Sequence, residues 1–141
     1  MKILFVVSEV EDLVKTGGLA DVGKALPLAL AKLGHDVKIV MPYYKQLADK
    51  FNADDCCTKQ LLYSGQNSYK FAVKSLSLEG LQVLAVDYPE YFDRKGLYAD
   101  DYHAYSDNAE RFAFFATAAL QASKAVDFQP DIVLVSYNHL P

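Results

Sequence analysis

The stretch KILFVVSEVEDLVKTGGLADVGKALPLALAKLGHDVKIVMP, residues 2–42, decides the fold. Its first six residues are dominated by Ile, Leu, Phe and Val, which is typical of a strand buried on both faces in a parallel sheet. A turn-rich segment, residues 8–18, leads to a helical pattern that continues through Leu33, and residues 36–41 read as a second buried strand closed by Pro42. Strand, helix and strand in this order predict a right-handed βαβ unit.

The helix inside this unit carries an apolar stripe and one residue that opposes a helix. The stripe consists of residues three or four positions apart: Val22, Leu26, Leu30 and Leu33. Pro27 lacks the amide hydrogen that a helix interior requires, so we expect the helix either to begin late, near Asp21, or to kink at Pro27. Gly34 is the expected C-terminal stop, because glycine adopts the left-handed conformation without a Cβ penalty.

The rest of the chain predicts further strands and one long helix. Residues 45–55 are polar with the pattern of a helical turn, and residues 69–78 and 81–86 read as a hairpin around Glu79-Gly80. Residues 87–105 form a long loop, and residues 106–126 form the clearest helix, with Asp107 and Glu110 spaced as a capping box. Residues 132–135 predict a short buried strand. We therefore expect a single α/β domain over residues 1–141, built on a Rossmann-like open sheet.

Composition and charge argue against several classes of binding partner for this protein. The net charge is −4 and the lysines form no stripe, which argues against nucleic acid or an anionic membrane as a partner. No apolar run approaches the roughly 18 residues of a membrane span, and the N-terminal run lacks a signal-peptide pattern. Cys56 and Cys57 are adjacent and lack metal-ligand spacing, so we expect reduced thiols in a cytoplasmic protein without a metal site.

The segment KTGGLADV, residues 15–22, is the most informative candidate site. It lies between the end of the first strand and the first helix, where open α/β sheets bind ligands. Gly17 and Gly18 let the backbone come close to a ligand, free amides at the helix start favour anionic oxygens, and Lys15 adds a positive charge. These parts suit a diphosphate. The alternative is that the glycines only make a tight turn and that Lys15 is solvated.

Two familiar phosphate motifs fail at this position. The dinucleotide fingerprint of nicotinamide oxidoreductases needs G-x-G-x-x-G directly after the strand, and the spacing of Gly17, Gly18 and Gly23 differs from it. Residues 18–24 read G-x-x-x-x-G-K, as in a P-loop, but Ala25 replaces the hydroxyl residue that would hold magnesium. Lys24 is therefore expected on a helix surface.

The same segment carries a family resemblance. Ser8-Glu9, then KTGGLADV at residues 15–22, then ALP at residues 25–27 are similar to the opening of bacterial and plant glycogen and starch synthases. The further matches are MPY at 41–43, FDR at 92–94, YSDN at 105–108, RF at 111–112 and PDIV at 130–133. The chain thus resembles the N-terminal portion of a bacterial glycogen (starch) synthase of the ADP-glucose type.

This resemblance implies a B-type glycosyltransferase, in which a cleft lies between two Rossmann-like halves. It implies transfer of glucose from ADP-glucose to the 4-hydroxyl at the non-reducing end of an α-1,4-glucan. The transfer would retain the configuration at the transferred carbon and would need neither a cofactor nor a metal.

Carried over residue by residue, the resemblance assigns roles on both sides of the cleft. Lys15 would contact the donor phosphates, and Asp21 would lie near the donor site or support its loop. Gly17 and Gly18 would line the same loop. The acceptor side would be shaped by three residues, namely Tyr98, Asp107 and Asn108. The alternatives are helix capping for Asp107 and loop packing for Tyr98.

The likeness ends after residue 133. The family continues there with H-A-H-D-W-H-A-G or a close variant, whereas this chain reads LVSYNHLP. His139 falls on the last histidine of that motif and is a further acceptor-side candidate, although Tyr137 stands in place of its aspartate. We expect a truncated or frameshifted chain that lacks the C-terminal donor-binding domain, is inactive by itself and self-associates through apolar surface. The alternative is a non-catalytic glucan- or partner-binding module of the same fold.

Overall fold

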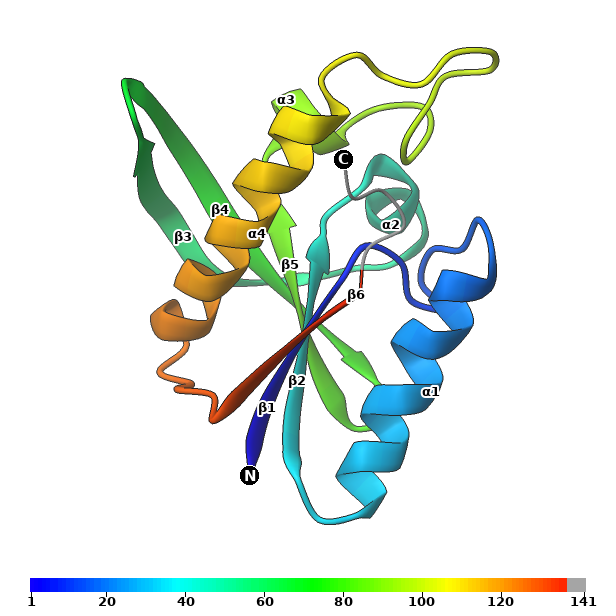
Figure 1. Cartoon of the computed structure of the whole chain (residues 1–141), viewed down its shortest axis with the longest axis vertical. Helices are drawn as coiled ribbons and strands as arrows, with labels where there is room; N and C mark the ends of the chain where they lie inside the picture. The colour runs from blue at the N-terminus through cyan, green and yellow to red at the C-terminus, as the bar shows by residue number, and fades with distance from the viewer. Residues whose placement is uncertain (137–141) are drawn as a thin grey trace.

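The computed structural model describes residues 1–136 and shows a six-stranded sheet flanked by helices (Figure 1). The strands lie in the order β3-β4-β5-β2-β1-β6. Their bounds are β1 (Lys2–Val7), β2 (Asp36–Pro42), β3 (Asp54–Ser64), β4 (Asn67–Leu78), β5 (Leu81–Asp87) and β6 (Ile132–Ser136). The pairs β5–β2, β2–β1 and β1–β6 are parallel, whereas β3–β4 and β4–β5 are antiparallel. The Rossmann-like open sheet is thus confirmed, with an antiparallel extension at one side.

The helices lie on both sides of the sheet. They are α1 (Gly18–Lys32), α2 (Lys45–Lys50), α3 (Pro89–Phe92) and α4 (Asn108–Ala125). α1 connects β1 to β2, and α4 precedes β6, so the two connections run in opposite directions across the parallel strands. Right-handed crossovers in opposite directions place their helices on opposite faces. Figure 1 accordingly shows α4 to the left of the parallel strands and α1 to the right.

β1 is the inner strand on which the parallel part is built. Phe5 is in register with Ile39 of β2 on one side and with Leu134 of β6 on the other. Leu4, Phe5 and Val7 are at most 1% exposed. The apolar run at residues 3–7 is therefore buried on both faces, as the sequence predicts for this strand, and the chain leaves the sheet at the carboxyl end of β1.

The structure decides between the two alternatives for α1. The helix begins at Gly18 and includes Pro27, so the expected late start near Asp21 is wrong. Gly34 follows the helix with φ of +95°, which confirms it as the stop. The helix faces the sheet with Ala20, Gly23 and Pro27, because small residues allow close approach.

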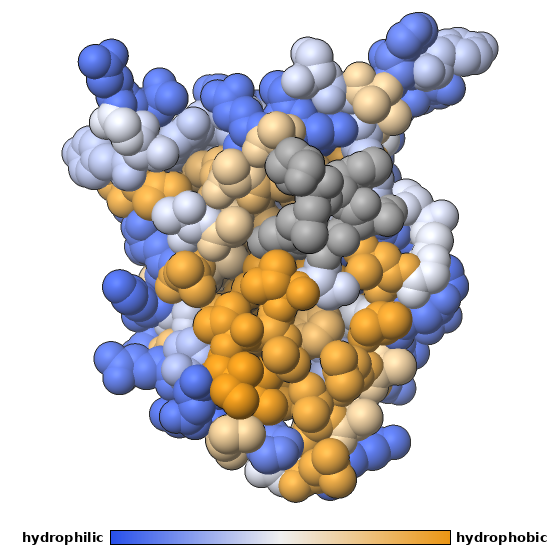
Figure 2. Space-filling model, in the orientation of Figure 1, coloured by the Kyte–Doolittle hydropathy of each residue, from blue (hydrophilic) through white to orange (hydrophobic). Residues whose placement is uncertain are grey.

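The apolar stripe of α1 lies largely outside the core. Val22 and Leu33 are 46% and 75% exposed. Figure 2 shows apolar surface over α1 and the neighbouring β6. β6 was expected to be a buried strand, but it lies at the sheet edge, and Val135 is 58% exposed.

Three further features differ from the sequence expectation. β3 was not predicted, because its polar sequence and its register shifts conceal a strand pattern. α3 lies inside the expected loop at residues 87–105. Asp107 precedes α4 as its N-cap residue but makes no side-chain capping hydrogen bond, so the expected capping box is wrong. Its carboxylate is bound by Arg94 instead.

Candidate functional site

The loop between β1 and α1 is folded back onto the start of α1. Val10 and Val14 form an isolated β-bridge, and the amide of Glu11 donates to the carbonyl of Ala20 at 2.9 Å. Gly17 is the N-cap residue, so the amides at the start of α1 follow it directly. The two glycines of the loop thus lie at the N-terminus of α1, beside the edge of the sheet at which the parallel strands end.

Packing explains why one of the three glycines in this region has no side chain, but it does not explain the other two. A Cβ at Gly23 would clash with the carbonyl oxygen of Glu9 and would lie 3.2 Å from Cγ2 of Val7, so packing excludes a side chain there. A Cβ at Gly17 or Gly18 would meet no atom within 4 Å. Packing among the described residues does not require these two glycines, and their backbone is open to a molecule that approaches from outside.

Lys15 is paired with one acidic residue of its loop and with one in the first turn of α1. Its Nζ lies 2.6 Å from Oδ1 of Asp21 and 3.7 Å from Oε1 of Glu11. The hydrogen bond to Asp21 raises the pKa of Lys15, so its ammonium stays charged at neutral pH. The pair is largely solvent-exposed, with 44% of the Lys15 side chain accessible. Lys24 pairs with Asp12, as fits the predicted helix-surface position.

Glu9 is a buried acid directly after β1, and sequence reasoning did not single it out. The residue is 0% exposed. Its Oε1 accepts the amide of Thr16 at 2.5 Å, and its Oε2 accepts the Thr16 hydroxyl at 2.8 Å. The Tyr98 hydroxyl donates to the same Oε2 at 2.6 Å. The carboxylate therefore ties the loop at residues 15–18 to a segment far away in the chain.

The structure brings the three acceptor-side candidates together. The Tyr98 hydroxyl is also 2.8 Å from Oγ of Ser8, and burial raises the pKa of this tyrosine well above its usual value. Nδ2 of Asn108 donates to the carbonyl of Tyr98 at 2.8 Å. The loop-packing interpretation of Tyr98 fits these contacts, because its hydroxyl points inward to Ser8 and Glu9.

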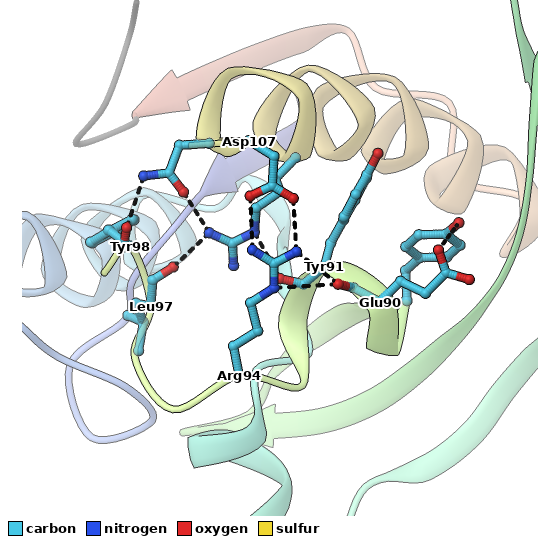
Figure 3. Close-up of polar contacts among 9 residues, drawn as sticks. Glu90, Tyr91, Arg94, Leu97, Tyr98 and Asp107 are labelled. Atoms are coloured by element: carbon cyan, nitrogen blue, oxygen red, sulfur yellow. Dashed lines mark hydrogen bonds and ion pairs between the residues drawn. The ribbon is translucent and has the colours of Figure 1, made fainter. Parts of the chain in front are cut away.

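Asp107 forms a two-pronged ion pair with Arg94 (Figure 3). Each carboxylate oxygen lies 2.8 Å from a guanidinium nitrogen. The Arg94 guanidinium lowers the pKa of Asp107 below its ordinary value. The guanidinium of Arg94 also donates to the carbonyl of Glu90, so the ion pair ties α3 to the start of α4.

Arg111 organises the inside of the same segment. It is 0% exposed and donates to the carbonyls of Tyr91 and Leu97 at 2.7 and 3.1 Å. The nitrogen that donates to Leu97, Nη1, also donates to Oδ1 of Asn108 at 2.7 Å. The family match at residues 111–112 was the only signal for this arginine in the sequence. Its guanidinium lies over the rings of Phe92, Tyr105 and Phe112.

Three further expectations concern His139, metal ions and a membrane. His139 lies outside the described residues. Among residues 1–136, no group of three or more His, Cys, Asp or Glu side chains is arranged to hold a metal ion. None of the helices in this part of the chain is both long and apolar enough to cross a membrane.

Comparison with known proteins adds an independent finding. A family model described as the starch synthase catalytic domain matches residues 2–136. Glycogen synthase of Aeromonas salmonicida (strain A449) is 51% identical over 134 residues, which are 94% of this chain and 28% of that protein. Glycogen synthase of Aliivibrio fischeri (strain MJ11) is 46% identical over 140 residues, 99% of this chain and 28% of the relative. The chain thus spans little more than a quarter of the length of these relatives.

A solved structure resembles the chain in three dimensions. It is the catalytic domain of starch synthase IV from Arabidopsis thaliana bound to ADP and acarbose, with a TM-score of 0.78 and 27% sequence identity. The similarity covers 94% of this chain and 27% of that one. The sheet and helices described above therefore have the arrangement found in that catalytic domain.

Proposed function

The chain belongs to the family of the starch synthase catalytic domain, and we propose that it is the N-terminal part of a glucosyltransferase of glycogen synthesis that uses ADP-glucose. The acceptor is the 4-hydroxyl of an α-1,4-glucan. The bond between glucose C1 and the diphosphate oxygen breaks, and ADP leaves with the bonding electrons. C1 bonds to the acceptor oxygen, which loses its proton, and the configuration at C1 is retained.

The observation that carries this proposal is the donor loop, residues 15–21. Gly17 and Gly18 leave open space at the start of α1, and the ammonium of Lys15 lies on the same loop. Amides at a helix N-terminus and a lysine together favour a diphosphate. The Arabidopsis structure is bound to ADP, a molecule with the same chemistry.

The residues of the donor loop take separate roles in this scheme. Lys15 contacts the donor phosphates, and Gly17 and Gly18 allow the backbone to approach them. Asp21 holds the Lys15 ammonium while the site is empty, since the two atoms lie 2.6 Å apart. The donor phosphate then replaces Asp21 as the partner of Lys15.

Three residues support the acceptor side from within: Tyr98, Asp107 and Asn108. Their polar atoms are bound to Glu9, Arg94 and Arg111, respectively. They therefore set the shape of the segment at residues 94–108. His139 belongs to the acceptor side in this scheme on the family motif alone.

The chain by itself is proposed to bind but not to transfer. Its relatives named glycogen synthase are much longer, and this chain spans 28% of them. Transfer requires both substrates in reactive geometry, and a B-type enzyme holds the donor nucleotide largely in its other half. The 141 residues thus form one wall of the cleft in a cytoplasmic enzyme.

Two measurements test the proposal. An isotope-labelled chain is titrated with ADP and, in parallel, with adenosine. We expect ADP to shift the amide signals of Gly17 and Gly18 and adenosine to leave them unchanged, because only ADP has phosphates. No shift at these amides contradicts the assignment of the donor loop.

The second measurement is ADP release from ADP-glucose in the presence of glycogen, compared with a heat-treated sample. We expect no release above that control. Release would show that this part of the family suffices for transfer. Cosedimentation of the chain with glycogen, without ADP shifts in the titration, would favour a non-catalytic glucan-binding module.

A further inference from the structure

We propose that Glu9 is a positioning residue that fixes the donor loop relative to the segment at residues 94–108. This inference rests on the proposed function of the donor loop. Glu9 is 0% exposed and its carboxylate is enclosed by protein donors, so it supports the loop from inside and does not contact a substrate.

The first half of the argument is the contact between Glu9 and Thr16. The carboxylate accepts both the amide and the hydroxyl of Thr16, at 2.5 and 2.8 Å. Thr16 lies between Lys15 and Gly17, so the two hydrogen bonds fix the backbone beside the residues proposed to meet the phosphates. An acid that accepts a backbone amide and a hydroxyl at once restrains the position and the orientation of that residue.

The main chain of Glu9 restrains the loop a second time. Its carbonyl oxygen lies so close to Gly23 that a Cβ there would clash with it. Glu9 therefore contacts α1 with its backbone and the donor loop with its side chain. The same residue thus holds the loop after β1 against both Thr16 and α1.

The second half of the argument is the contact between Glu9 and Tyr98. The Tyr98 hydroxyl donates to Oε2 at 2.6 Å, and the carbonyl of Tyr98 accepts Nδ2 of Asn108. Asn108 in turn accepts a hydrogen bond from the buried Arg111. A continuous series of hydrogen bonds thus leads from the donor loop to the start of α4.

A carboxylate at this place has a cost that an apolar residue would not have. A buried acid is tolerated only where donors compensate for the lost water. Within residues 1–136, three hydrogen bonds to the carboxylate contribute to that compensation, and they come from the two segments that must be placed relative to each other. A residue that only filled space in the core would not need a carboxylate with hydrogen-bond donors around it.

The test is hydrogen exchange of the Thr16 amide in the whole chain, without ligand, followed by an ADP titration. Glu9→Gln keeps the size of the side chain but replaces one acceptor oxygen by an NH2 group. We expect exchange at Thr16 to accelerate by about tenfold or more, since one hydrogen bond to a charged acceptor is lost. The ADP-induced shifts at Gly17 and Gly18 should shrink at the same ADP concentration.

Tyr98→Phe is the second variant, and it keeps the core volume while removing one donor. It should accelerate exchange at Thr16 in the same direction, and it decides the question if Glu9→Gln does not fold. Ser123→Ala is the control, because its buried hydroxyl donates to the carbonyl of Phe128, away from the loop. This control should lower the unfolding temperature and leave the relative protection of Thr16 unchanged.

Each result decides one of the two proposals. If exchange at Thr16, relative to the amides of β1, is the same in wild type, Glu9→Gln and Tyr98→Phe, the positioning role is wrong. If exchange depends on Glu9 but wild type shows no ADP shifts, the positioning of the loop stands and the donor site is wrong. If Glu9→Gln only lowers the unfolding temperature, as Ser123→Ala does, Glu9 has a merely structural role and the inference fails.

Discussion

The ammonium of Lys15 lies 2.6 Å from Oδ1 of Asp21, six residues further along the chain and already in the first turn of α1. Both side chains are substantially exposed, so the pair contributes little to stability. In the proposed function its significance lies in binding, because a donor phosphate would replace Asp21 as the partner of the ammonium. Asp21 keeps the Lys15 side chain beside the helix start until then.

The first prediction concerns the two lysines of this region. Lys15→Ala should weaken ADP binding by about tenfold or more, since a charge-assisted hydrogen bond to phosphate is lost. Lys24→Ala removes the same charge but is the matched control, because Lys24 pairs with Asp12 at the helix surface. Titrations of the labelled variants with ADP measure both. Equal losses for the two variants would place the phosphates elsewhere.

The second prediction separates two kinds of glycine. Gly23→Ala should lower the free energy of unfolding by about 1–3 kcal/mol, because the new Cβ would clash with the carbonyl of Glu9. Gly17→Ala should change it by no more than about 0.5 kcal/mol, because its Cβ would meet no atom within 4 Å. Urea unfolding measures both variants.

The same pair of variants tests the donor loop. Gly17→Ala should weaken ADP binding although it leaves the fold intact, because its methyl group occupies the space proposed for the ligand. A stable Gly17→Ala variant that binds ADP like wild type would contradict this use of the open space. A Gly23→Ala variant as stable as wild type would contradict the packing of α1.

Much of the parallel sheet could be predicted from the sequence. Residues 3–7 and 39–41 are continuous apolar runs, which is typical of strands buried on both faces. β3 could not be predicted, since its burial depends on α4 and on a partner strand rather than on its own alternation. Pro27 left open whether α1 begins late or kinks, because the sequence alone does not show that the helix begins at Gly18 and includes this proline.

The position of the candidate site in the fold could be predicted, but the hydrogen bonds that hold its residues in place could not. The order of strand, glycines and helix placed Lys15 and Gly17 at the carboxyl edge of the sheet. Glu9 was visible only as part of a family match, because its partner Tyr98 is 89 residues away in the chain. Asp107 was interpreted as an acceptor-side residue or as a helix cap, since the sequence does not show that Arg94 would bind its carboxylate.

The third prediction concerns acid. The Arg94 guanidinium lowers the pKa of Asp107, so this group stabilises the fold above the pKa of an unfolded aspartate, about 4, and the stabilisation is lost as pH falls through the folded value. Asp107→Asn should therefore lower the free energy of unfolding by about 1–2 kcal/mol at pH 7. The difference from wild type should shrink toward pH 3. Urea unfolding at both pH values checks this.

Asp101→Asn is the control for that measurement. Asp101 pairs with Lys95 at the surface, and both side chains are at least 60% exposed. Its substitution should change the free energy of unfolding very little at either pH. A difference between Asp107→Asn and wild type that stays constant or grows toward pH 3 would contradict the proposed ion-pair contribution.

The last prediction is that the purified chain self-associates through the edge strand β6. β6 pairs only with β1 in the described part of the sheet, it has no charged residue, and apolar side chains are exposed along it, with Val135 at 58% (Figure 2). Such an edge invites pairing with another chain, whereas β3 at the other edge carries charges and register shifts that hinder it. Val135→Lys should therefore lower the average mass in sedimentation experiments at a concentration where wild type associates. Tyr102→Lys, at an exposed loop position, adds the same charge and should leave association unchanged. A wild-type chain that stays monomeric at all concentrations, or equal effects of both lysines, would rule out β6 as the contact.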